Sequence, residues 1–144
     1  MEYRIRPCRL DDARAICCLS RTELGYDYPL DAVRKKLKAL LGKDSERILV
    51  AEAEGVVVGY IHAADYDVLY APHMKNIMGI AVSGYCRRHG VGRALLAAIE
   101  AWARDTGASG VRLVSGETRT GAHEFYCRCG YDTNKKQVNF RKIF

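Results

Sequence analysis

The residues from Val82 to Arg93 carry the clearest chemical signature in the sequence. An apolar run ends at Val82, the spacing Arg87-x-x-Gly90-x-Gly92 follows, and a helical pattern begins directly after it. A helix that starts from a glycine turn presents unpaired backbone N–H groups and the positive end of its dipole, and together these bind phosphate. Glycine lets the backbone approach an anion closely, and a flanking guanidinium neutralises its charge. We therefore expect a pyrophosphate site at a segment that we call the phosphate turn, which comprises Arg87, Arg88, His89, Gly90, Val91, Gly92 and Arg93.

Two better-known phosphate loops do not fit these glycines. A Walker-type loop ends in Gly-Lys-Ser/Thr, which is missing here. The dinucleotide fingerprint Gly-x-Gly-x-x-Gly has the reverse spacing and lies early in a strand–helix unit. Two glycines at this spacing also occur in turns that bind nothing, so the spacing alone leaves that interpretation open.

The same segment resembles the acyl-CoA motif of the GNAT superfamily of N-acetyltransferases, whose commonest form is Val-x-Pro-x-Tyr-Arg-Gly-Lys-Gly-x-Gly. The matching residues are Val82, Arg87, Gly90 and Gly92. The departures are Gly84 for the proline, Cys86 for the aromatic residue, Arg88 for a glycine and His89 for a basic residue. The resemblance implies that acetyl-CoA is the co-substrate of this chain.

A second segment, Ala122-x-x-Phe125-Tyr126-x-Arg128-x-Gly130-Tyr131, resembles the downstream GNAT segment Ala-x-x-Phe-Tyr-x-Lys/Arg-x-Gly-Phe/Tyr. Arg119 stands where the family usually has an asparagine. The resemblance implies that Arg119 and Arg128 contact the co-substrate. It also implies that the Tyr126 hydroxyl lies beside the CoA sulfur as the general acid, although this tyrosine also fits a packing role in its helix.

Amide formation from a thioester requires a neutral amine. An alkylammonium with a pKa near 10.4 is neutral in only about one molecule in 10³ at pH 7, so a positioned base helps. The candidate is Glu117, just past the strand expected at 111–115; its rivals are Asp65, His62 and His123. The developing oxyanion needs N–H donors, and in the family these are the strand amides that correspond to Ile80, Ala81 and Val82.

These motifs predict an acetyl-CoA-dependent N-acetyltransferase that moves the acetyl group directly to a primary amine in a ternary complex. The alternative is a non-catalytic acyl-CoA-binding regulatory module. Tyr26, Asp27, Tyr28, Asp65, Asp67 and Tyr70 lie in two loops that cover the acceptor side in GNAT folds. The acceptor is a small-molecule or peptide amine that the sequence does not identify. We expect no metal, because the histidines lack ligand spacing. A homodimer is common in the family.

The elements that position these residues follow from hydrophobic periodicity. Strands are expected at 3–6, 48–53, 56–64, 76–82 and 111–115, with helices at 10–19, 30–41, 91–102 and 120–129 and a closing hairpin within 131–144. This order predicts an α/β chain. The GNAT resemblance makes it a single domain over residues 1–144, with a mixed central sheet, a split between the strands 76–82 and 111–115, and helices on both faces.

The composition agrees with a folded enzyme domain. The chain has 144 residues, 49% hydrophobic and 28% charged, which suits one domain with its own core. No apolar run reaches the about 18 residues of a membrane span and no signal region opens the chain, so a cytoplasmic location is expected. The net charge of +6 fits the phosphates of CoA; nucleic-acid binding is the weaker interpretation, because the basic residues are scattered. The six cysteines follow no disulfide framework, which predicts free thiols.

Overall fold

The computed structural model describes residues 1–133 and 135–144. The chain divides into two compact units, Met1–Leu113 and Val114–Phe144, and each is described by itself. Each of the six cysteines is a free thiol, as expected. Among the described residues, no helix is both long enough and apolar enough to span a bilayer.

The first unit is built on a five-stranded mixed sheet. Its strands follow the order of the chain: β1 (Arg4–Pro7), β2 (Glu46–Ala53), β3 (Val56–Tyr66), β4 (Met74–Val82) and β5 (Val111–Leu113). The first three pairings are antiparallel and β4 pairs with β5 in parallel. A parallel pair needs a crossover connection, and helix α3 (Val91–Asp105) supplies it. A tight hairpin joins β2 to β3, and both of its central residues, Glu54 and Gly55, have positive φ.

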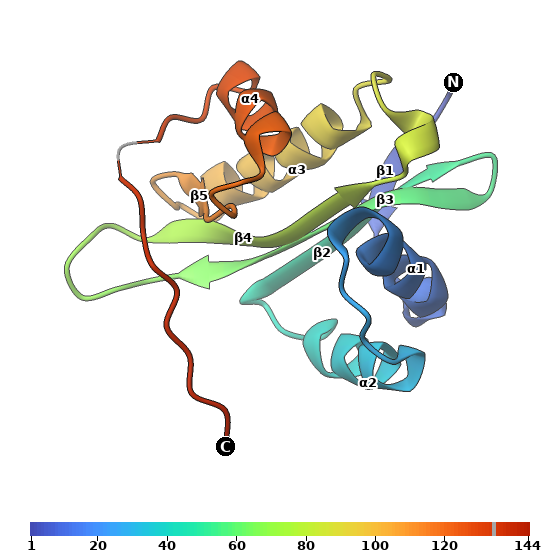
Figure 1. Ribbon diagram of the computed structural model, residues 1–144, viewed down its shortest axis with the longest axis horizontal. Helices are drawn as coiled ribbons and strands as arrows, with labels where there is room; N and C mark the ends of the chain where they lie inside the picture. The colour runs from blue at the N-terminus through green and yellow to red at the C-terminus, as the bar shows by residue number, and fades with distance from the viewer. Residues whose placement is uncertain (134) are drawn as a thin grey trace. The chain divides into compact units, whose positions relative to one another are not determined.

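Helices cover both faces of this sheet, as Figure 1 shows for α1 (Ala13–Leu24), α2 (Leu30–Leu40) and α3. The first two helices share one core with Ile48, Val50 and Tyr60. On the other face, α3 buries four aliphatic side chains that are at most 1% exposed: Val91, Leu95, Leu96 and Ile99. Each such side chain contributes about 1.5–3 kcal/mol through burial. Gly59 permits this close packing, because a Cβ there would lie 3.3 Å from Val91.

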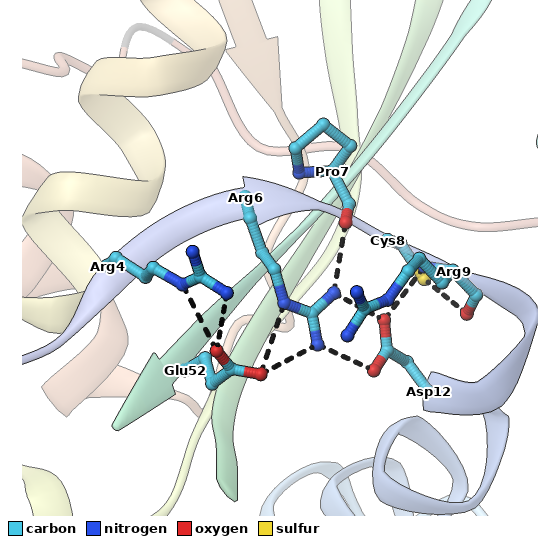
Figure 2. A network of polar contacts seen from close by, with 7 residues as sticks. All are labelled: Arg4, Arg6, Pro7, Cys8, Arg9, Asp12 and Glu52. Atoms are coloured by element: carbon cyan, nitrogen blue, oxygen red, sulfur yellow. Dashed lines mark hydrogen bonds and ion pairs between the residues drawn. The ribbon is translucent and has the colours of Figure 1, made fainter. Parts of the chain in front are cut away.

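A network of ion pairs fixes the first strand to its neighbours (Figure 2). The Arg6 guanidinium donates to both carboxylate oxygens of Asp12, at 2.8 and 2.9 Å, and also to Glu52 on β2. Asp12 lies in a short 3₁₀ helix (Leu10–Asp12) that leads into α1. Burial alone would raise the pKa of Asp12, but the hydrogen bonds from Arg6 and from the Arg9 N–H outweigh it and lower that pKa. The network therefore anchors α1 to the edge of the sheet.

The second unit contains one helix among its described residues, α4 (Thr120–Arg128). Two sequence-based predictions fail here. The strand expected at 111–115 ends at Leu113, and the described residues 131–133 and 135–144 form no strand where a hairpin was expected; Asn134 lies outside the described residues. The alternating side chains Val138 and Phe140 are exposed at 77% and 88%. A strand requires a ladder partner, and a two-stranded hairpin alone is marginal in water.

Candidate active site

The strands β4 and β5 diverge from each other inside the first unit. Their ladder in the described residues runs from Lys75–Val111 to Ile77–Leu113, whereas β4 continues to Val82. A β-bulge marks the point of divergence: His62 pairs with Gly79 and Ala63 with Ile77, so Met78 is an extra residue on β4. A bulge bends its strand and increases the local twist. The expected split is thereby confirmed, and the bulge gives it a physical cause that the sequence did not show.

The backbone of β4 beyond the bulge presents N–H groups at this split. The Ser83 N–H donates to Val58 O at 2.8 Å, which makes that pair a hydrogen-bonded one. Because hydrogen-bonded and non-bonded pairs alternate in an antiparallel ladder, the N–H of Ala81 faces β3. Those of Ile80 and Val82 point to the opposite edge, where β5 has ended. Of the three expected donors, these two have the direction that an oxyanion site needs.

The phosphate turn leads from β4 into the first turn of α3. Arg87, Arg88 and His89 are exposed, and a short 3₁₀ helix (Gly84–Cys86) precedes them. Gly90 precedes the helix with φ +79°, and no side chain of the described residues caps the helix. The first intrahelical bond runs from the Ala94 N–H to Gly90 O at 3.0 Å, so the N–H groups of Val91 and Gly92 at the helix start are placed as donors for an anion.

Arg88 shows what the family glycine does at its position. Its φ is +69°, in the left-handed region that costs a non-glycine residue roughly 1–2 kcal/mol. Strain of this kind tends to occur at ligand-binding segments. Arg88 adopts this conformation without being a glycine and adds a third guanidinium to the turn.

Glu23 contacts the phosphate turn and was missed by sequence reasoning. Its Oε1 lies 3.1 Å from Arg87 Nη2, and its Oε2 accepts from the Gly84 N–H at 3.3 Å. Glu23 lies in the last turn of α1, more than 60 residues before its partners. No sequence pattern near Glu23 predicts a contact with residues so far along the chain.

In the second unit, α4 carries Tyr126 between two aromatic neighbours. Its ring centroid lies 5.3 Å from that of Phe125 and 6.2 Å from that of Tyr131. Burial raises the pKa of the Tyr126 hydroxyl above its ordinary value, and the positive charge of Arg119 opposes this shift. Arg119 is the residue before the first turn of α4 and Arg128 is its last residue. The hydroxyl therefore stays protonated at neutral pH, as a proton donor must.

The candidate bases differ in their surroundings. Glu117 is 75% exposed and forms an ion pair with Lys136 at 3.0 Å. In the same unit, His123 Nε2 donates to Gly116 O at 2.9 Å. In the first unit, His62 Nε2 lies 2.8 Å from Glu46, and Asp65 is bound by Lys75 and by His73. Of these four, Glu117 is the carboxylate with the greatest access to solvent.

The two loops expected on the acceptor side present exposed aromatic side chains. Tyr26 is 66% exposed, Tyr28 is 47% exposed, and Tyr70 is 84% exposed. The described residues contain no group of three or more His, Cys, Asp or Glu side chains placed to hold a metal ion.

Comparison with known proteins places the chain in a family. The sequence model of the acetyltransferase (GNAT) family matches residues 12–131. A curated relative, the aminoglycoside N(6')-acetyltransferase type 1 of Stenotrophomonas maltophilia, is 29% identical over 115 residues, which cover 77% of this chain and 75% of that protein.

Solved structures share the fold. AAC(6')-Iy in complex with the bisubstrate analogue CoA-S-monomethyl-acetylneamine superposes with a TM-score of 0.88 at 21% identity and covers 100% of both chains. A transcriptional regulator from Bacillus halodurans C-125 superposes with a TM-score of 0.87 at 16% identity, covering 98% of this chain and 100% of that one. At these identities the likeness shows the α/β fold and leaves function to the family match. Because that match extends over both sequence motifs, the chain belongs to the acetyltransferase (GNAT) family, and its activity is the acetyl-CoA-dependent N-acetylation of an amine.

Proposed function

We propose that this chain transfers the acetyl group directly from acetyl-CoA to a primary amine of a small cationic molecule, within a ternary complex. The observation that carries the proposal is the uncapped start of α3 behind Gly90, beside a strand whose Ile80 and Val82 amides face an open edge. Direct transfer is favoured over a covalent enzyme intermediate because the thiol next to the phosphate turn, that of Cys86, is buried at 9% exposure. A buried thiol is a poor nucleophile.

The phosphate turn would hold the pyrophosphate of acetyl-CoA. The N–H groups of Val91, Gly92 and Arg93 lie at the positive end of the α3 dipole. The guanidinium groups of Arg87 and Arg88 add charge-assisted donors. With the pyrophosphate fixed there, the acyl arm would extend along β4, where the amides of Ile80 and Val82 stabilise the negative charge that develops on the thioester oxygen.

Tyr126 acts as the general acid in this proposal. The leaving thiolate has a pKa near 8.5, and a donor at the sulfur makes it a better leaving group. The Tyr126 hydroxyl is protonated at neutral pH and can therefore donate; burial raises its pKa and so makes it a weaker acid. Arg119 and Arg128 flank this side chain along α4 and are proposed to contact the co-substrate.

Glu117 is the proposed base for the incoming ammonium. Its high exposure allows an incoming cation or a water molecule to reach it. The ion pair with Lys136 holds the carboxylate in one place, while an exposed pair of this kind is worth only about 0.2–1 kcal/mol and can open. The carboxylate can therefore exchange Lys136 for the acceptor amine.

A small polyamine is the proposed class of acceptor. The curated relative is named for acetylation of the 6'-amine of aminoglycosides. In this chain the loop after α1 offers Tyr26, Asp27 and Tyr28, and aromatic faces together with a carboxylate attract ammonium groups. An aminoglycoside with a 6'-amine is the first candidate to test.

We further propose one catalytic domain over residues 1–144 that acts as a cytoplasmic homodimer. The C-terminal residues Val138, Phe140, Ile143 and Phe144 support the dimer, because each is at least 75% exposed. Apolar exposure of this extent within a short segment marks a contact surface. Light scattering after size exclusion would give the oligomeric state.

The proposed function is tested by a panel of amines incubated with acetyl-CoA, with free CoA thiol as the readout. Aminoglycosides that carry a 6'-amine form one arm, and otherwise similar ones with a 6'-hydroxyl form the control. Short lysine peptides form a third arm. We expect thiol release with the 6'-amine compounds and background release with the 6'-hydroxyl compounds. Release with peptides alone would overturn the small-molecule acceptor, and no amine-dependent release would favour an acyl-CoA-binding regulatory module.

A further inference from the structure

Glu23 places a carboxylate against the segment that would bind the phosphates of acetyl-CoA. Oε1 accepts from Arg87 Nη2 at 3.1 Å and Oε2 accepts from the Gly84 N–H at 3.3 Å. The Glu23 side chain is only 17% exposed, whereas that of Arg87 is 68% exposed. The carboxylate is thus held by α1, and the guanidinium is the more exposed partner.

The two oxygens of Glu23 have opposite consequences for an anion. The bond to the Gly84 N–H fixes the start of the 3₁₀ helix that precedes the phosphate turn, which favours binding through preorganisation. The bond to Arg87 occupies a donor that a phosphate would use, and the negative charge of Glu23 repels the phosphate.

We propose that Glu23 is the counter-ion of Arg87 in the free protein and that acyl-CoA displaces it, so that Glu23 sets the affinity of the phosphate turn. The Arg87 guanidinium exchanges one carboxylate oxygen for a phosphate oxygen, and the proton count stays unchanged because both partners keep their charge. Glu23 keeps its hydrogen bond to Gly84 throughout and is a positioning residue rather than a catalytic one. The inference rests on acyl-CoA binding at this turn, as proposed above.

Substitution by glutamine separates the two effects. The amide oxygen of Glu23→Gln still accepts from the Gly84 N–H, while the negative charge beside Arg87 is gone. The side chain keeps its length, so the packing at the end of α1 is preserved. Removing one charge a few ångströms from a phosphate at near-aqueous screening changes affinity by about 3- to 10-fold.

The test is the dissociation constant of acetyl-CoA measured by calorimetry, independently of turnover. Glu23→Gln should bind acetyl-CoA about 3- to 10-fold more tightly than the wild type, and the gain should shrink at high salt. Acetyl-pantetheine lacks the pyrophosphate, so its affinity should stay the same in both proteins. Asp31→Asn is the control, because it removes the same charge from a side chain that is 99% exposed on α2; it should leave both affinities unchanged.

A double-mutant cycle shows whether Glu23 acts through Arg87. In an Arg87→Gln background, Glu23→Gln should raise the acetyl-CoA affinity by a smaller factor than in the wild type, because only the direct repulsion between Glu23 and the phosphate is left to remove. Weaker or unchanged binding by Glu23→Gln alone, or an equal gain in both backgrounds, would overturn the exchange. Failure of the wild type to bind acetyl-CoA is a distinct result, since it would remove the proposed function together with this inference.

Discussion

The Nζ of Lys75 lies 3.8 Å from the centroid of the Trp102 ring, and the residue is only 2% exposed. The contact joins β4 to α3, the two elements on either side of the phosphate turn. Lys75 also forms an ion pair with Asp65 on β3. An ammonium so far from water is stable only with such partners.

Removing this lysine should destabilise the first unit. We expect Lys75→Ala to lower the free energy of unfolding by about 3–5 kcal/mol, because it leaves a cavity beside Trp102 and removes one of the two partners of Asp65. Lys35→Ala, at an exposed position of α2, should change it by no more than about 0.5 kcal/mol. Urea unfolding followed by Trp102 fluorescence gives both values. A loss for Lys75→Ala as small as that of the control would contradict a stabilising role for the Lys75 contacts.

Gly90 and Gly107 form a matched pair at the two ends of α3. Both have positive φ, +79° and +78°, so alanine at either should cost roughly 1–2 kcal/mol of backbone strain. Gly90→Ala should also weaken acetyl-CoA binding by about 10-fold or more, a loss of about 1.4 kcal/mol, because it alters the start of the helix that holds the anion. Gly107→Ala should bind normally. Calorimetry gives the acetyl-CoA affinity of both variants. Equal affinities would show that the phosphate site does not lie at the start of α3.

Tyr126→Phe tests the proposed acid while keeping the ring that packs between Phe125 and Tyr131. We expect kcat to fall by about 10², with acetyl-CoA affinity changed by less than about 3-fold. Tyr131→Phe removes a hydroxyl from the neighbouring ring and should leave kcat nearly unchanged. If both variants retain wild-type kcat when chemistry limits turnover, Tyr126 is a packing residue.

Glu117→Gln tests the proposed base. Loss of the carboxylate should depress kcat/KM by about 10² and remove the limb of the pH profile on which activity rises with pH. Glu124→Gln, an exposed carboxylate on α4, serves as the control and should keep both the rate and the profile. An unaltered profile in Glu117→Gln would exclude this residue and direct attention to Asp65, His62 and His123.

Local patterns in the sequence were sufficient for much of the fold. The strands β2 and β3, the helical stripe of α3 and the glycine turn before it each depend on residues close together in the chain, and each was confirmed. The GNAT motifs supplied the split in the sheet, which no periodicity in the chain predicts.

The errors and omissions involve contacts between distant residues. The bulge at Met78 depends on the register of β3 against β4, and a register is invisible in either strand alone. Lys75 is a buried residue of β4, although the strand was expected to begin at residue 76; its partners Asp65 and Trp102 lie on two other elements. Glu23 was missed for the same reason. The C-terminal hairpin failed because alternation at Val138 and Phe140 does not provide a ladder partner.

The central claim is that this chain moves an acetyl group from acetyl-CoA to an amine of a small cationic molecule. Mass spectrometry of an aminoglycoside with a 6'-amine, after incubation with acetyl-CoA and the wild-type protein, tests it most directly. The account predicts a product heavier by one acetyl group, located on the 6'-nitrogen by fragmentation, and its near absence with Tyr126→Phe over the same time. An unmodified aminoglycoside, in the presence of a protein that demonstrably binds acetyl-CoA, would contradict the proposed acceptor.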